Sequence, residues 1–270
     1  MSDTDNDILA SYFTPYTADA AAADTREASK MGGVRHLQMS KLPPGSYLFR
    51  FLPPRPGRKS LFVIKYTHFV KGAEKTRAVP CARLMEGAPC KVCSVMEALD
   101  STGLAADVAA SKELAPEFSV LSTVLDMTVP FDPEHALDQC AVLEFKKGIH
   151  TDLLALRNNP HAGGDFSHPT NGFGIAISKS GSGMKTEYGV LPSMSARGLI
   201  APTMEHAVAI LKDAPDAWSF ARTLTAEEVD AALVECGYGS FVNGQGVQPR
   251  PPAGGNAASM LNMNLSAPRR

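Results

Sequence analysis

The sequence predicts a mainly β protein: a small antiparallel barrel with inserted elements and short helices at its periphery. Three observations support this fold class. Several short stretches alternate apolar and polar residues between proline or glycine breaks, which is typical of strands. Few segments look helical, and one strand face is basic. Apart from the fold class, hydrophobic residues make up 44% of the 270 residues, which is enough for a packed core.

Strands are expected where this alternation is clearest. In the first of them, Phe49 and Phe51 alternate with Arg50 and Leu52 between two proline pairs. A Gly/Ser turn separates the last two strands. The expected strands cover 43–54, 60–70, 76–80, 117–129 and 140–145, and two more lie within 172–192.

Helices are expected where start and stop signals frame an apolar stretch. The last helix has the clearest signals, with Thr225 as N-cap, Glu228 as its capping-box partner and Gly237 as terminator. The expected helices run from the cysteine pair at 90–93 to about Gly103, and then cover 104–112, 146–160, 203–215 and 225–237.

Composition divides the chain into three parts. Residues 1–33 are acidic and Ala-rich, which predicts a flexible N-terminal arm. From residue 241 to 270 the chain is rich in Gly, Pro and Asn, which predicts a disordered tail. The folded core is therefore expected over 34–240. No apolar run approaches the 18 residues of a transmembrane helix, and the acidic start is unlike a signal peptide, so we expect a cytoplasmic protein without a membrane partner.

Charge is unevenly distributed along the chain. The whole sequence has a net charge of −2, but residues 34–91 contain twelve Lys or Arg and two Glu, a local net charge of +10. The next block, 92–139, contains nine acids and one base. A long basic block with few compensating acids is typical of polyanion binding, although a solvated charged face would have the same composition.

Three of the five cysteines and one histidine have the spacing of a metal site. The set is His68-x12-Cys81-x8-Cys90-x2-Cys93. A C-x2-C pair lets two thiolates approach one ion from a tight turn, and Cys81 and His68 are the nearest further ligands. Three thiolates and an imidazole favour one structural zinc ion, because no coordination position is left for substrate or water.

Other interpretations of these cysteines are weaker. A redox pair would need only Cys90 and Cys93, and it would leave Cys81 without a role. A zinc deaminase would need a Glu two residues after its ligand histidine, where this chain has Val70. Cys140 and Cys236 lie in apolar contexts and are expected in the core. There is no G-x-S-x-G motif, and the glycines at 181–183 lack the Lys-Ser/Thr of a P-loop, so no enzyme is predicted.

Aromatic residues are interleaved with the basic ones. Single-stranded nucleic acid is bound by this combination, because cations follow the phosphates and aromatic rings stack on bases. Phe49, Phe51 and Phe62 are explained at least equally well as barrel core. The expected DNA-binding residues are Arg50, Lys65, Tyr66, Phe69, Lys71, Lys75, Arg77, Lys146, Lys147, Lys179, Lys185 and Tyr188.

The chain resembles a known family at several stretches in the same order. These are "YLFRFLPP" (47–54), the His/Cys set with "APCKVC", "AVLEFKKGIHTDL" (141–153) and "GFGIAISKSGSGMKTEYGVLP" (172–192). The family is that of the zinc-containing single-stranded DNA-binding proteins of tailed bacteriophages, of the T-even helix-destabilising type.

The resemblance implies an OB-fold core with a zinc subdomain, at about 66–100, inserted between early strands. It implies sequence-independent binding of single-stranded DNA in phage replication, recombination and repair, inside the host cytoplasm. It places the zinc ligands on His68, Cys81, Cys90 and Cys93. It also implies that replication or recombination proteins are reached through the tail. The departures are an acidic arm instead of a basic one, and a tail without acids that ends in Arg269-Arg270.

Overall fold

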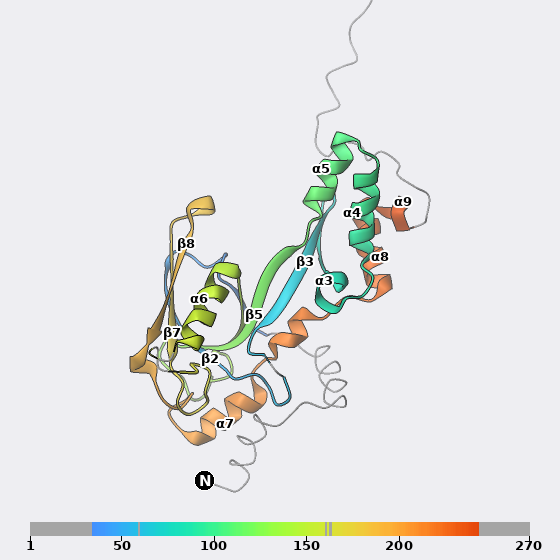
Figure 1. Ribbon diagram of the computed structural model, residues 1–270. Helices are drawn as coiled ribbons and strands as arrows, with labels where there is room; N and C mark the ends of the chain where they lie inside the picture. The colour runs from blue at the N-terminus through green and yellow to red at the C-terminus, as the bar shows by residue number, and fades with distance from the viewer. Residues whose placement is uncertain (1–33, 59, 160, 162–163, 243–270) are drawn as a thin grey trace, which may run out of the picture. The chain divides into compact units, whose positions relative to one another are not determined.

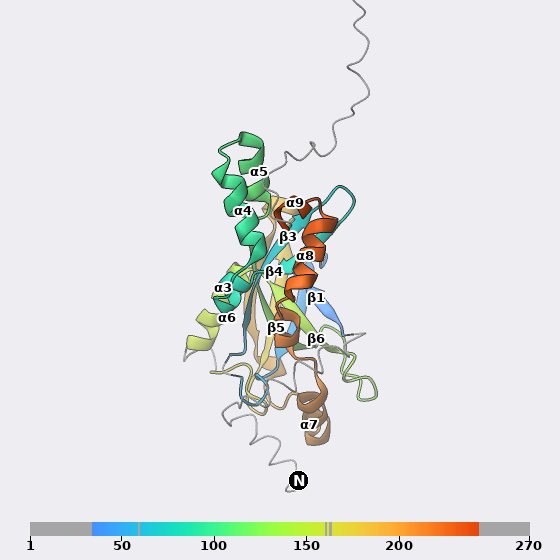
Figure 2. The same cartoon turned by 90° about the vertical axis from the view of Figure 1, so that its right-hand side faces the viewer.

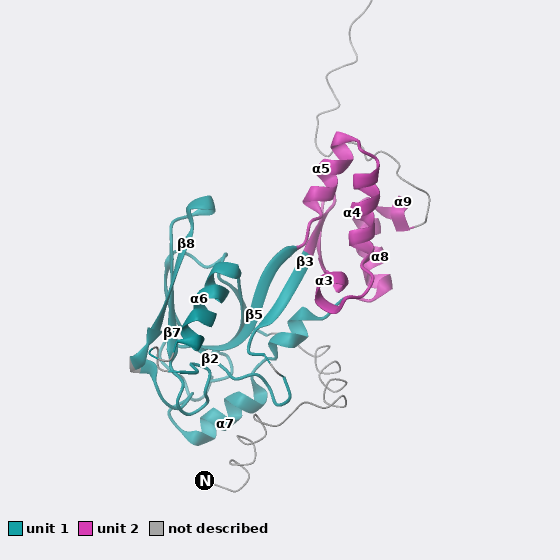
Figure 3. Ribbon diagram, viewed as in Figure 1, with its two compact units in different colours: residues 1–67, 117–223 teal, residues 68–116, 224–270 magenta. Residues whose placement is uncertain are grey.

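A computed structural model describes residues 34–242, except residues 59, 160, 162 and 163 (Figure 1). These residues form two compact units (Figure 3). Unit 1 consists of the residues up to Thr67 together with Glu117–Thr223, and unit 2 consists of His68–Pro116 and the residues from Leu224 onward. The predicted arm over 1–33 and almost all of the predicted tail lie outside the described residues. Unit 2 extends beyond the zinc subdomain expected at about 66–100.

Unit 1 is built on a mixed sheet whose strands follow the order β1-β6-β5-β2-β7-β8. Neighbouring strands are antiparallel except β1 and β6, which are parallel. Among the described residues the path is open, because no pairing joins its end strands β1 and β8. A mainly β fold is therefore confirmed, whereas strand pairing alone does not close a barrel. The strands are β1 His36–Gln38, β2 Gly45–Phe51, β5 Glu117–Asp126, β6 Cys140–Phe145, β7 Gly174–Ser180 and β8 Glu187–Ser193.

The ten-residue strand β5 is long enough to pair with two strands in turn. Its end pairs with β2, with Phe51 opposite Val124. Its beginning pairs with the first half of β3 (Val63–Lys71), from Val63 opposite Leu121 to Thr67 opposite Glu117. The second half of β3 belongs to unit 2.

Aromatic side chains fill the core on one face of the sheet. Phe49 and Phe51 face this core, as the alternation in β2 predicts, and both are fully buried. The Phe51 ring meets Phe62, Phe145 and Phe166 at centroid distances of 6.2, 6.4 and 5.4 Å in edge-on contacts, which aromatic pairs favour. The interpretation of Phe49, Phe51 and Phe62 as core residues is confirmed. Helix α6 (Lys147–Asn158) adds Ile149 and Leu153 to the same core.

The opposite face of the sheet is covered by α7 (Met204–Asp213) and the residues before it. Leu52 and Leu125 of the sheet pack here against Ile200 and Ile210. Cys140 belongs to this second core, and burial raises the pKa of its thiol to about 12. Its expected structural role is confirmed. Short 3-10 helices η2 (Gly183–Lys185), η3 (Met194–Ala196) and η4 (Ala217–Ala221) complete unit 1.

Unit 2 is mainly helical. The second half of β3 forms a hairpin with β4 (Thr76–Pro80), and Gly72 N–H donates to the Lys75 carbonyl across its turn at 2.7 Å. The helices are α3 Ala82–Glu86, α4 Lys91–Ser101, α5 Ala105–Glu113, α8 Ala226–Glu235 and α9 Gly239–Val242. Helices at 91–101, 105–113 and 226–235 confirm the sequence predictions, whereas α3 and α9 were not predicted. No helix among the described residues is both long and apolar enough to cross a membrane.

Helix α8 comes from far along the chain and packs beside the β3–β4 hairpin (Figure 2). The predicted capping box is present, because Thr225 and Glu228 exchange side-chain and backbone hydrogen bonds. At its other end, the Cys236 thiol donates to the Val70 carbonyl at 3.1 Å. Gly72 fits against this end because it has no side chain: a Cβ there would lie 2.9 Å from the Cys236 Cα. The expected structural role of Cys236 is thereby confirmed.

Candidate metal centre and nucleic-acid surface

The four predicted metal ligands come together inside unit 2. His68 lies within β3, Cys81 precedes α3, and Cys90 and Cys93 lie at the start of α4. All four side chains are buried, and their ligand atoms lie within 4.8 Å of one another. The predicted cluster is therefore present, and it can hold a metal ion.

Distances within the cluster fit one four-coordinate ion. His68 Nε2 lies 3.6 Å from Cys90 Sγ and 3.5 Å from Cys93 Sγ, and Cys81 Sγ lies 3.6 Å from Cys93 Sγ. A tetrahedron with metal–sulfur bonds of ~2.3 Å has edges of about 3.8 Å, and edges to nitrogen are slightly shorter. Three of the six distances between the four atoms thus match a tetrahedral site, and the other three are at most 4.8 Å.

A backbone group orients the histidine. His68 Nδ1 lies 2.6 Å from the carbonyl of Leu114, a buried residue directly after α5. When Nδ1–H donates to this carbonyl, the Nε2 lone pair faces the thiols. A metal-binding histidine usually donates its second ring N–H in this way. The sequence gives no sign of this partner, because any residue at position 114 would supply a carbonyl.

The buried thiols oppose one another's ionisation. Burial is the largest influence on Cys90, but hydrogen bonds with His68 and Cys93 outweigh it and lower the pKa of Cys90 to about 6. At Cys93, burial and the neighbouring Cys81 thiol raise the pKa to about 12. A bound cation would resolve this conflict, because it stabilises all the thiolates at once.

On unit 1, the predicted contact Tyr66 belongs to a partly exposed apolar strip. Tyr66 of β3 is opposite Phe118 of β5, and their rings meet edge-on at 5.5 Å. Ile64, two residues earlier on the same strand face, is 48% exposed. We call Ile64, Tyr66 and Phe118 the aromatic strip. Phe118 was not among the predicted contacts.

Two lysines lie at the end of the aromatic strip. Lys146 Nζ makes an ion pair of 2.8 Å with Glu117, the neighbour of Phe118. Lys147 follows as the first residue of α6 and is exposed. Lys65 alternates with Tyr66 on β3, so it projects to the other face of the strand, where its charge reaches Glu144. The structure thus places Tyr66, Lys146 and Lys147 in one region and Lys65 on the opposite face.

Two predicted DNA contacts are wrong because their side chains are internal. Arg50 is 1% exposed, and its guanidinium donates to the His168 and Gly198 carbonyls at 2.9 and 2.8 Å. Burial lowers the pKa of Arg50 to about 10, against the opposing influence of Asp165. A phosphate cannot reach this group. Sequence reasoning placed it on the surface because a charged residue in a strand is usually exposed.

Lys179 is the second correction. It is 9% exposed, and its ammonium donates to the Ser40 and Leu42 carbonyls at 2.7 and 2.5 Å. These carbonyls belong to the segment after the end strand β1, so a side chain of β7, the neighbour of the other end strand β8, connects the two sides of the open sheet. We call this contact the Lys179 clamp. Its role is structural, because the ammonium is nearly buried and two of its three N–H donors are used within the protein.

The hairpin that follows the Lys179 clamp contains two further predicted residues. Tyr188 packs partly against the core, its hydroxyl lies 3.4 Å from the Met39 carbonyl, and burial raises its pKa. Lys185 lies in η2 at the hairpin tip and is exposed. In this hairpin Lys185 is therefore accessible to a phosphate, whereas Tyr188 is half-buried beside the clamp.

The predicted contacts in unit 2 are partly engaged with acids. Lys71 lies 3.9 Å from Glu113, and Arg77 Nε donates to Glu235 at 2.7 Å. Lys75 is exposed in the β3–β4 turn, whereas Phe69 is half-buried. Exposed ion pairs contribute about 0–1 kcal/mol each, so a phosphate could replace either acid.

The two units differ in net charge, and this difference changes the interpretation of the basic block. The described parts of unit 2, residues 68–116 and 224–242, contain six Lys or Arg and ten Asp or Glu, a net charge of −4. Residues 34–67 and 117–223 of unit 1 contain fifteen Lys or Arg and twelve acids, a net charge of +3. The positive charge predicted around the metal centre therefore belongs to unit 1 after folding.

Comparisons with known proteins add no relatives. No protein-family model matches the chain, and a search of curated proteins finds no match.

Proposed function

We propose that this chain binds single-stranded DNA without sequence preference through unit 1, and that one zinc ion stabilises unit 2. The observation that carries the proposal is the aromatic strip, with Lys146 and Lys147 at its end. The rings of Tyr66 and Phe118 are half-buried, so each keeps some surface open to solvent. Such rings beside cations are the chemistry of single-strand binding, because rings stack on any base while cations follow the phosphates. The net charge of +3 on unit 1 supports the same surface.

Strand order supports an OB-fold for unit 1. An OB-fold arranges its strands in the order 3-2-1-4-5 and has a helix between strands 3 and 4. The order β6-β5-β2-β7-β8, with α6 between β6 and β7, follows this path. In such folds the face of strands 2 and 3 and the loops 1–2 and 4–5 bind oligonucleotides. Those loops correspond here to the β2–β5 connection, which contains Tyr66, and to the hairpin tip with Lys185.

The donor set of the metal centre supports zinc. Three thiolates and one imidazole at tetrahedral spacing suit this ion, and all four positions are filled by protein. When bound, zinc would supply structural cross-linking. His68, Cys81, Cys90 and Cys93 would hold it, and the Leu114 carbonyl would keep the imidazole oriented. The position where a deaminase has its Glu is Val70, a buried apolar residue.

A second function has one observation in its favour. The net charge of −4 on unit 2 disfavours contact with DNA there and favours a zinc-stabilised module that binds a basic partner. The resemblance to phage proteins would place both activities in phage replication, recombination and repair in the host cytoplasm. Replication proteins are expected to bind the tail, and almost all residues of the tail lie outside the described range.

Binding to labelled oligo-dT and to duplex DNA, measured by fluorescence anisotropy, tests the proposal. We expect oligo-dT to bind more tightly, with log K falling on log[salt] by about 0.7 per phosphate contact. Tyr66→Leu should weaken binding by roughly 5- to 150-fold, the ~1–3 kcal/mol of one stacked base, at an unchanged salt slope.

Two exposed lysines provide a test variant and its matched control. Lys147→Ala should make the salt slope shallower by about 0.7. Lys212→Ala, at an exposed lysine in the last turn of α7, should change neither affinity nor slope. A preference for duplex, or an affinity that does not depend on salt, would rule out the proposed surface.

A further inference from the structure

The tip of the β7–β8 hairpin presents an apolar side chain to solvent. Met184 lies in η2 and is fully exposed, at 106%, which is the highest value for a large hydrophobic residue among those described. The tip is held in shape, because the Lys185 N–H donates to the Ser182 carbonyl at 3.1 Å and the Thr186 hydroxyl donates to the Gly183 carbonyl at 2.8 Å. A methionine on such a tip is available for contact with another molecule, because its flexible side chain adapts to irregular apolar sites.

A positive charge stands beside this methionine. Lys185 is exposed and is the last residue of η2, and residues 181–186 contain no acid. Glu187 lies behind the tip, where β8 begins opposite Ser180. The hairpin therefore leads with one apolar side chain and one cation.

An apolar pocket of about 290 Å³ lies on unit 1 beside the end of β5. Two segments form its wall: 125–131 together with Gln139, and 199–202. Val129 of this wall is 53% exposed, so the pocket is open to solvent. The volume would hold roughly ten water molecules at ~30 Å³ each, which leaves room for a methionine side chain.

The two polar side chains of the wall are used within the protein. Asp126 accepts from Arg35 at 2.7 Å and from the Thr128 N–H at 3.0 Å. The Gln139 amide donates to the Pro130 carbonyl, and its oxygen accepts from the next loop at 3.1 Å. Because these groups already have partners, the pocket favours an apolar occupant over a polar one.

The surroundings of the pocket are acidic even when the arginines are counted. The loop 132–138 leaves the wall at Phe131, returns at Gln139 and exposes three carboxylates. With histidines counted as neutral, the segments 125–139 and 197–206 together with Arg35 have a net charge of −3. The charged residues are the acids Asp126, Asp132, Glu134, Asp138 and Glu205 and the bases Arg35 and Arg197. An apolar side chain accompanied by a cation therefore complements this pocket.

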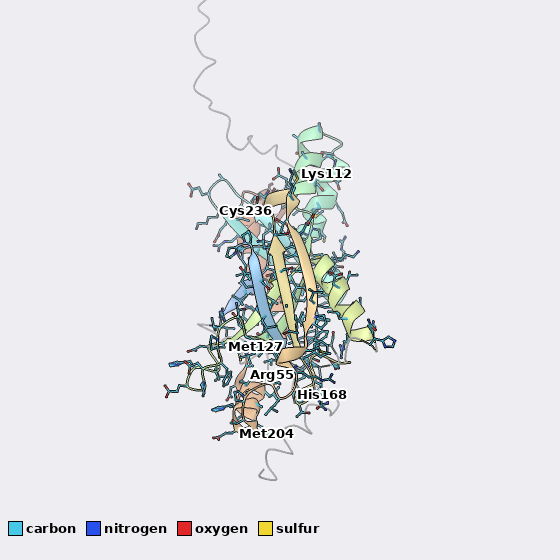
Figure 4. The ribbon with its side chains drawn as sticks, turned by 90° about the vertical axis from the view of Figure 1, so that its left-hand side faces the viewer. Arg55, Lys112, Met127, His168, Met204 and Cys236 are labelled. Atoms are coloured by element: carbon cyan, nitrogen blue, oxygen red, sulfur yellow. The ribbon has the colours of Figure 1, made fainter. Side chains whose placement is uncertain are left out.

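The hairpin tip and the pocket lie at opposite ends of unit 1. Figure 1 shows the end of the β7–β8 hairpin and helix α7, which begins just after the pocket, at the two ends of the unit. In Figure 4 the labelled Met127, of the pocket wall, and Met204, of α7, lie far from the hairpin tip. The strand pairing agrees. The Met127 N–H donates to the Leu48 carbonyl, and Leu48 pairs with Ala176, from which Ser180 lies roughly 14 Å further along β7 at ~3.4 Å per residue. The tip of one copy is thus directed away from its own pocket.

We infer that the hairpin tip of one copy binds the pocket of a second copy, with Met184 in the pocket and Lys185 at its acidic rim. A pair joined in this way keeps one free tip and one free pocket, so further copies can add head to tail. The contact is small, and association should accordingly be weak. Lys185 cannot pair with a DNA phosphate and with this rim at once, so the inference concerns the DNA-free protein and does not rest on the proposed function.

Sedimentation velocity of the full chain without DNA gives the first test. The sedimentation coefficient should rise with protein concentration. Met184→Ser should lower the association constant by roughly 10- to 150-fold, which is the loss expected when one methionine side chain is no longer buried. The matched control is Leu191→Ser, which changes an exposed leucine of β8 away from the tip and should leave association unchanged.

Mixing two variants tests the head-to-tail arrangement. Val129→Asp places a charge at the pocket and keeps the tip, whereas Met184→Ser keeps the pocket. Each variant alone should stay monomeric at concentrations where the unmodified chain associates, and an equimolar mixture should form pairs that add no third copy. The emission of Trp218, in η4 of unit 1, should be the same in both variants as in the unmodified chain and would show that unit 1 is folded. An unmodified chain that stays monomeric, association that survives either substitution, or a mixture without pairs would overturn the inference.

Discussion

Replacing Lys179 with methionine separates the structural role of this residue from the DNA-binding role that its charge suggests. The ammonium donates to the Ser40 and Leu42 carbonyls in a nearly buried setting. Methionine keeps most of the aliphatic stem but cannot donate. Both carbonyls would then lose their partner, and β7 would lose its Lys179 clamp to the segment after β1.

The magnitude follows from the two hydrogen bonds. Each bond from a charged donor contributes ~1.5–3 kcal/mol, so the gross loss is about 3–6 kcal/mol. Releasing a lysine side chain returns up to ~2 kcal/mol of conformational entropy. We therefore expect unit 1 to lose about 1–4 kcal/mol, and its melting temperature to fall by roughly 2–16 °C.

Tryptophan fluorescence provides the assay. The chain has one tryptophan, Trp218 in η4 of unit 1, with the Arg58 guanidinium 4.8 Å from its ring centroid. Its emission should therefore report the unfolding of unit 1. Lys185→Met, at an exposed position of the neighbouring hairpin tip, should change stability by no more than ~0.5 kcal/mol.

DNA binding by the same two variants completes the comparison. The salt slope of oligo-dT binding should stay unchanged in folded Lys179→Met protein and become shallower in Lys185→Met. If Lys179→Met kept its melting temperature within about 1 °C and lowered the salt slope, the clamp interpretation would be refuted.

Three other measurements test separate parts of the structure. Cys90→Ser should reduce zinc from one ion per chain towards none and speed hydrogen exchange in unit 2, whereas Cys140→Ser should retain the metal; equal zinc contents would contradict the proposed ligand set. Burial lowers the pKa of His150 below its ordinary value of 6.5. The stability that the neutral imidazole contributes is therefore fully present above pH 6.5, and it is lost as the pH falls through the folded-state pKa. His150→Phe should flatten this acid-side slope in urea titrations, and an identical slope would show that other groups cause it. Gly72→Ala should destabilise unit 2 by ~1–3 kcal/mol, because the new methyl would press on the Cys236 backbone; unchanged exchange near the β3–β4 turn would contradict that close packing.

Local signals explain which features the sequence predicted well. The ligand set depends on residue types and on short spacings within 68–93, and the same four residues lie together in the structure. The capping box at Thr225 and Glu228 is equally local, as is the alternation that directs Phe49 and Phe51 into the core. In each case the residues that decide the outcome lie close together in the sequence.

Long-range contacts explain which features the sequence did not predict. Lys179 reaches carbonyls almost 140 residues away, and Lys91 pairs with Asp230 at a separation of 139 residues. The partners of Arg50, Lys179 and His68 are backbone carbonyls, which have no sequence signature. Their charge alone suggests that Arg50 and Lys179 lie on the surface, and only the fold shows that both are internal.

The fold also divides the charged residues between the two units, and this bears on the proposed location of DNA binding. Read along the chain, the metal segment lies within a block of net charge +10. In unit 2, however, acids from α4, α5 and α8 neutralise it: Arg83 pairs with Glu97, Lys71 with Glu113, and Arg77 with Glu235. A zinc ion with three thiolates would add one further negative charge. The net charge of −4 on unit 2 disfavours DNA there, so under the proposed function the phosphate contacts should fall mainly on unit 1, beside the half-buried rings of Tyr66 and Phe118.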